Sequence, residues 1–110
     1  METVIRQSSA HQPDRSQILA EIRPIVRPRL DVPSLAGTLQ RTEAVTKILR
    51  SLLAEFENDD REAMRVMRRL GSRLLAEMPK GEPSPYTAWQ YLVNLARCTE
   101  AFLAVENRSR

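Results

Sequence analysis

At 110 residues with 42% hydrophobic and 28% charged side chains, the chain has the composition of one small globular domain, which excludes wholesale disorder. Its formal net charge is +3, and no run of about 18 apolar residues is present to cross a membrane. The single cysteine permits no internal disulfide, and residues 1–17 lack the apolar core of a signal peptide. We therefore expect a cytoplasmic protein with no membrane association.

Residues 1–33 are predicted to form an N-terminal arm. Within it, residues 14–23 can form a short helix that Asp14 caps and Pro24 ends, with an apolar face made of Ile18, Leu19 and Ile22. The following segment contains three prolines, which fix the backbone and bias the preceding residues to extended geometry. This segment is therefore expected to be an extended strap that carries Arg23, Arg27 and Arg29.

Three long helices are predicted within residues 34–110, which would form the bundle domain. They are expected near residues 40–57, 60–78 and 85–106, because apolar side chains recur there at the helical period. No segment reads as a strand, and the links between the helices are short, as they are between antiparallel neighbours. The sequence therefore predicts an all-α fold, a small bundle of three long helices with the arm strapped across it.

Capping residues mark the ends of these helices. Ser34 is a candidate cap for the first helix, Asn58 or Asp59 for the second, and Ser84 for the third. Gly71 lies inside the second helix, where glycine costs about 1 kcal/mol relative to alanine. Such a glycine indicates a close crossing with another helix.

The last predicted helix is apolar over an unusually wide part of its surface. A helix at the edge of a bundle needs an apolar stripe of somewhat over ~100°, and this helix shows roughly twice that. Two explanations are open: the chain covers the wide face itself, or a partner or second copy covers it. Because large aromatic side chains dominate interface energetics, the second explanation predicts a partner interface at Trp89, Tyr91, Leu92, Leu95 and Phe102.

Residue types that carry catalysis are sparse. His11 is the only histidine and lies in the polar arm, whereas Cys98 is the only cysteine and lies on the apolar side of the last helix. Together they supply neither a zinc ligand set nor a convincing catalytic pair. The acids between Glu55 and Asp60 fit no calcium loop, and no glycine-rich phosphate loop is present. We therefore expect a non-catalytic protein without a metal or cofactor.

Arginines recur about once per turn along the predicted second helix. They face away from a predicted apolar stripe of Ala63, Met67, Leu70, Leu74 and Met78. Such a row can follow nucleic-acid phosphates without reading their sequence. A solvated face is the alternative, and a GC-rich genome would also favour arginine over lysine. The predicted nucleic-acid-binding residues are Arg61, Arg65, Arg68, Arg69 and Arg73, with Arg27 and Arg29 from the strap.

No motif in the chain identifies a family. In architecture the chain resembles the small all-helical subunits of multi-subunit CRISPR effector complexes, and residues 91–110 are similar in texture to the last helix of the type III small subunits. This stretch is about a fifth of the chain and includes no diagnostic residue. The resemblance implies a short, basic, non-catalytic protein that lines a nucleic-acid channel between larger neighbours.

The sequence thus favours a non-catalytic small subunit of a larger, nucleic-acid-associated assembly. Its arginine face would contact phosphate, and its apolar C-terminal helix would dock to a protein partner or a second copy. The alternative is a protein-only adaptor, chaperone, immunity protein or antitoxin whose arginine face meets an acidic protein. A small enzyme forms a third class, which the missing acid–base and metal sets oppose.

Overall fold

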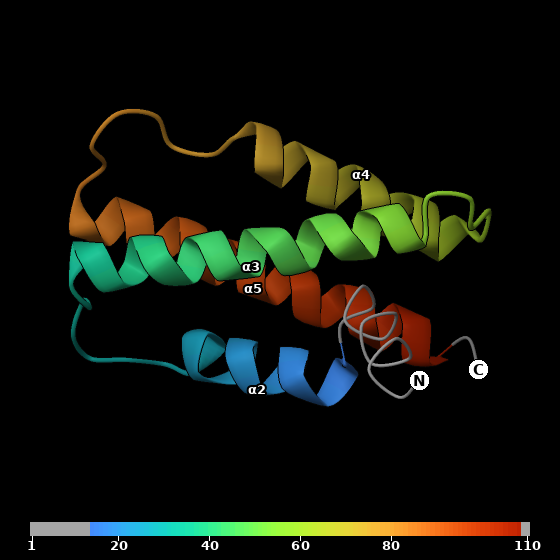
Figure 1. Cartoon of the computed structure of the whole chain (residues 1–110), viewed down its shortest axis with the longest axis horizontal. Helices are drawn as coiled ribbons and strands as arrows, with labels where there is room; N and C mark the ends of the chain where they lie inside the picture. Colours follow the sequence, from blue (N-terminus) through green and yellow to red (C-terminus); the bar gives the residue numbers. More distant parts are fainter. Residues whose placement is uncertain (1–13, 109–110) are drawn as a thin grey trace, which may run out of the picture.

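The computed structural model describes residues 14–108, in which four helices follow one another along the chain (Figure 1). Helix α2 spans Arg15–Val26, α3 spans Leu35–Glu55, α4 spans Glu62–Ala76 and α5 spans Pro85–Arg108. No strand occurs in this part of the chain, so the predicted all-α class is confirmed. The three long helices of the prediction correspond to α3, α4 and α5.

Helix α5 is the centre of the bundle. It packs against α3, α4 and α2, whereas α2 and α4 do not touch each other. These two outer helices lie on opposite sides of the pair formed by α3 and α5 (Figure 1). The last helix of the chain is therefore covered by its own chain from three directions.

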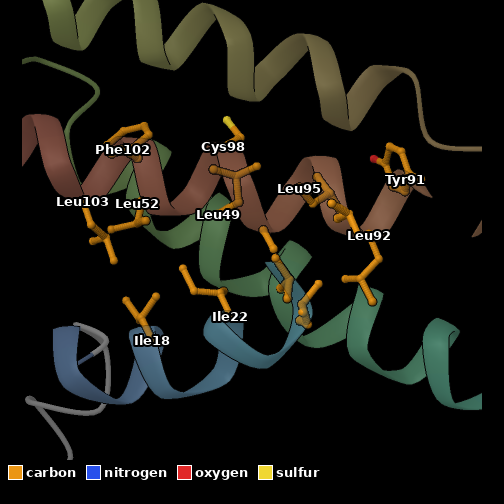
Figure 2. Packing of buried hydrophobic residues seen from close by; sticks show 14 of the residues in the cluster. Ile18, Ile22, Leu49, Leu52, Tyr91, Leu92, Leu95, Cys98, Phe102 and Leu103 are labelled. Atoms are coloured by element: carbon orange, nitrogen blue, oxygen red, sulfur yellow. The ribbon is translucent and has the colours of Figure 1, made fainter. Parts of the chain in front are cut away.

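The core consists of apolar side chains that α2, α3 and α4 direct onto α5. Ile18 and Ile22 of α2 point toward α5 and α3, and Cys98 on α5 points toward α4 (Figure 2). Each of α2, α3 and α4 buries residues spaced three or four apart, which is the helical period. These side chains are Ile18, Ile22 and Ile25 from α2, Val45, Leu49 and Leu52 from α3, and Met64 and Met67 from α4.

Helix α2 continues past Pro24, so the prediction that this proline ends the helix is wrong. Proline lacks only its own N–H donor, and near a helix end this removes a single hydrogen bond. Ile25 is 1% exposed, and its burial in the core holds the last turn in place. The backbone N–H of Arg27 still donates to Arg23 at 3.2 Å. This part of the predicted arm is therefore a bundle helix, and the segment after it has no regular secondary structure.

Asp14 caps α2 as predicted, because its carboxylate accepts the N–H of Ser16 at 2.8 Å. Of the three capping predictions for the long helices, two are confirmed. The Ser34 hydroxyl accepts a hydrogen bond from the N–H of Gly37 at 3.3 Å, and the Ser84 hydroxyl accepts one from the N–H of Thr87 at 3.1 Å. The cap of α4 differs, because its N-cap residue is Arg61 and no side chain caps it. Asp59 instead accepts the Arg61 N–H at 3.0 Å, in a local turn of the kind that Asp favours.

Gly71 marks a close crossing between α4 and α3, as expected. A Cβ atom at this position would lie 3.2 Å from Cδ2 of Leu53 and 3.4 Å from Cδ1 of Leu49. The absence of a side chain at Gly71 therefore lets the two helices approach. This contact also fixes which side of α4 faces the core.

The apolar stripe predicted for α4 is wrong in its rotation about the helix axis. The buried side is centred on Met64, Met67 and Gly71, so that Leu70 is 45% exposed and Ala63 is also exposed. With the helix rotated toward Met64, Gly71 lies against Leu53 and Leu49 of α3. Two apolar side chains, Leu70 and Val66, are left on the outside as a result.

Candidate functional site

The five predicted partner-interface residues of α5 lie inside the bundle. Leu92, Leu95 and Phe102 are fully buried. Trp89 and Tyr91 are each 8% exposed. Helix α2 provides the additional cover that the sequence left uncertain. Of the two explanations for the wide apolar face, the structure supports the first: the chain covers the face itself. It offers no support for a partner interface at these residues.

The polar tips of the two aromatic residues are also engaged within the chain. The Tyr91 hydroxyl donates a hydrogen bond to the Leu74 carbonyl at 2.8 Å, and burial raises the pKa of this phenol. The Arg29 guanidinium lies 5.5 Å from the centre of the Trp89 ring, within the range of a cation–π contact. Arg29, one of the two strap arginines predicted to bind nucleic acid, therefore contacts α5 instead.

Arg61 is held by the loop that precedes α4. Its Nε donates to Oδ1 of Asp59 at 2.9 Å, and its backbone N–H donates to the same carboxylate. These hydrogen bonds, the side-chain one first, lower the pKa of Asp59 to about 2. Arg61 therefore stabilises the turn between α3 and α4 rather than joining the outer face.

Arg68 closes the C-terminal end of α3. Its guanidinium donates to the carbonyl of Phe56 at 2.8 Å and also to the carbonyl of Asp59. The last carbonyls of a helix lack intrahelical partners, and a basic side chain can satisfy them. Arg68 is accordingly half-buried, and its role is structural.

Of the five arginines predicted for the second long helix, three remain on the outer face of α4. Arg65, Arg69 and Arg73 are exposed and follow one another at intervals of four residues. At a rise of about 1.5 Å per residue, the row is ~12 Å long. Arg73 Nε lies 3.6 Å from Oε2 of Glu77, an exposed pair of the kind that contributes little to stability. We call these three residues the arginine row.

The two strap arginines do not join this row. Arg27 and Arg29 lie on the segment that links α2 to α3, and α2 is on the opposite side of the bundle from α4 (Figure 1). Arg29 contacts Trp89 and lies 3.8 Å from Asp31. The structure therefore separates the predicted nucleic-acid site into one continuous row on α4 and a distant strap.

A second row runs beside the arginines; of its two members, Leu70 was predicted to face the core and Val66 was not assigned. Val66 is 42% exposed and Leu70 is 45% exposed, and they are four residues apart. Their spacing from Ala63 gives the signal that could have identified them, because positions 63, 66 and 70 form a stripe separate from the buried one. The outer face of α4 is thus part basic and part apolar.

An ion cluster that was not predicted from the sequence lies at the end of the bundle where α3 and α5 finish and α4 begins (Figure 1). Arg15 donates from Nε and Nη2 to both carboxylate oxygens of Glu106 at 2.8 Å, and from Nη2 to Glu55 at 2.7 Å. Glu106 is 7% exposed, and Arg15 lies 6.0 Å from the Phe56 ring centre. The cluster joins α2, α3 and α5, so we infer that its role is to stabilise the fold.

Within residues 14–108, no group of three His, Cys, Asp or Glu side chains is placed to hold a metal ion. Cys98 is buried, and this burial raises the pKa of its thiol. His11 lies outside the described residues. None of the described helices is long and apolar enough to span a bilayer.

Comparisons with protein-family models, with curated proteins and with solved structures returned no match. The site must therefore be interpreted from its own geometry. Its most distinctive element is the arginine row, with the apolar stripe beside it.

Proposed function

We propose that this protein is a non-catalytic, cytoplasmic helical subunit that contacts the phosphates of a nucleic acid through Arg65, Arg69 and Arg73. The observation that carries the proposal is that these three guanidinium groups form one exposed row, whereas Arg61 and Arg68 are engaged by the fold. Arginine suits phosphate because its planar fork matches the oxygens and is weakly hydrated. Phosphate contacts of this kind position a strand without reading its sequence.

Such a short row implies that the protein acts beside other subunits. Proteins that bind nucleic acid strongly commonly make about 6–10 phosphate contacts, and each contact makes binding more sensitive to salt. Three contacts on a single strand give a slope of about −2 for the logarithm of the association constant against the logarithm of the salt concentration. We therefore propose that the protein contributes one part of a binding surface in a larger assembly.

The test is fluorescence anisotropy with a labelled single-stranded oligonucleotide over a range of salt concentrations. The variant R65E/R69E/R73E should lose at least tenfold in affinity, because three attractive charges become repulsive. The matched control is R41E/R50E/R97E, which changes the net charge equally at exposed positions elsewhere on the bundle. Equal losses in both variants would show a general charge effect and would reject the row as the site.

A second candidate is the protein-only adaptor, in which the row binds an acidic protein. It is favoured by the ion pair between Arg73 and Glu77, because this pair shows a carboxylate beside one guanidinium of the row. An adaptor would show no binding to the oligonucleotide at low salt. It would bind an acidic protein with a dependence on Arg65 and Arg69, and this result would replace the nucleic-acid proposal.

A further inference from the structure

The apolar stripe on the outside of α4 has the spacing of a helix–helix seam. Ala63, Val66, Leu70, Arg73 and Glu77 follow one another at intervals of three, four, three and four residues, and all five are exposed. This alternation is the one by which a helix packs along another helix. We call these five residues the outer seam of α4. It lies apart from Met64, Met67 and Gly71, which face the core.

The outer seam is complementary to itself when two copies run antiparallel. With the two-fold axis midway between Val66 and Leu70, each Val66 meets the Leu70 of the other copy. In the same register each Ala63 meets the Arg73 of the other copy, whose guanidinium then reaches the neighbouring Glu62. A parallel arrangement would instead place Arg73 on Arg73 and Glu77 on Glu77, and like charges in contact are unfavourable.

We propose that the outer seam of α4 binds the outer seam of a second copy of this chain, antiparallel, with Val66 and Leu70 at its centre and an Arg73–Glu62 ion pair at each end. The contact is short, which places it among small, weak interfaces. Exposed apolar side chains rimmed by charges are typical of such surfaces. The second copy is favoured over other occupants because one register brings Val66 against Leu70 and Arg73 beside Glu62.

The pairing enlarges the site of the proposed function, on which this second step rests. A two-fold axis normal to the two helices keeps equivalent sides of both copies on the same face. Arg65 and Arg69 lie to one side of the seam, so these two arginines from each copy would form one surface, while Arg73 pairs with Glu62 across the contact. Two chains would then bind a single strand together, and the dimer would make more phosphate contacts than one arginine row can.

The first test is sedimentation velocity of the full chain over a range of concentrations, alone and with a short single-stranded oligonucleotide. The wild-type protein should shift to a dimer as concentration rises, and V66S/L70S should remain monomeric. The control V32S/L39S replaces an equally exposed Val–Leu pair, 46% and 47% exposed, and should still dimerise. A wild-type monomer under both conditions, or a dimer in V66S/L70S, would overturn the proposal.

Charge exchange tests the register. E62R alone and R73E alone should each weaken the dimer, and E62R/R73E should restore it. Failure of the double variant to recover, with helix content unchanged by circular dichroism, would reject the antiparallel register. The variant R65E/R69E separates the two proposals, because it should dimerise but not bind the oligonucleotide. A wild-type dimer that binds no oligonucleotide would overturn the proposed function and leave the seam standing.

Discussion

The packing of α2 decides whether α5 is a core helix or an open surface, and Ile22→Ala tests it directly. Ile22 is fully buried between α2 and α5. Truncating a buried isoleucine to alanine removes apolar contacts and leaves a cavity, at a cost of about 2–5 kcal/mol. Because α2 lies at the edge of the bundle and can relax into the space, we expect about 3 kcal/mol. This is a large part of the ~5–15 kcal/mol stability of a typical domain.

The assay is urea unfolding followed by far-ultraviolet circular dichroism and by the fluorescence of Trp89. Glu21→Ala is the control, since Glu21 is the exposed neighbour on the same helix, and it should change stability by no more than about 0.5 kcal/mol. The two probes should report one transition in each variant. If Ile22→Ala costs less than about 1 kcal/mol, α2 is not docked in solution, and the partner-interface explanation of α5 becomes the better one.

Three further outcomes are expected. Arg15→Ala removes two hydrogen bonds to the buried Glu106, and should lower the free energy of unfolding by about 1–3 kcal/mol in urea titrations. NMR titration of the Asp59 carboxyl should give a pKa of about 2. Its contribution to stability is therefore present above the ordinary pKa of 3.8 and is lost as the pH falls toward 2. Arg61→Ala should return the pKa toward 3.8, and an unchanged pKa would refute the assigned cause. Gly71→Leu should destabilise by at least about 1–3 kcal/mol in thermal melts, because α3 occupies the space; a stabilised variant would contradict the close crossing.

Helix positions could be predicted from the sequence because the signals that start a helix are local. The hydroxyls of Ser34 and Ser84 reach N–H groups only three residues away, and this geometry depends on nothing else in the chain. The predicted cap of α4 was wrong because more than one local arrangement was open to Asp59. The Asp59 carboxylate accepts hydrogen bonds from the backbone N–H and the guanidinium of Arg61 instead of capping α4. Residue type alone does not show which of these two arrangements forms.

Orientation and cover could not be predicted, since they depend on contacts between distant segments. The rotation of α4 is fixed by Gly71 against Leu53, eighteen positions earlier in the sequence. The extension of α2 beyond Pro24 depends on Ile25 entering a core that α5 completes. The same contacts decided the candidate site, because they engaged Arg68 and exposed Leu70. The arginine row was predictable as a pattern, but its reduction to three members was not.

The central position of α5 also governs the order in which the fold can form. Helices α2, α3 and α4 all precede α5 in the chain, and each of them packs more extensively against α5 than against any other helix. A growing chain emerges from the ribosome at about 5–20 residues per second, N-terminal part first. Until α5 emerges, α2, α3 and α4 lack the helix that joins them in one core. Folding is therefore expected to complete only after synthesis of α5, with the isoleucines of α2 exposed to chaperones in the interval.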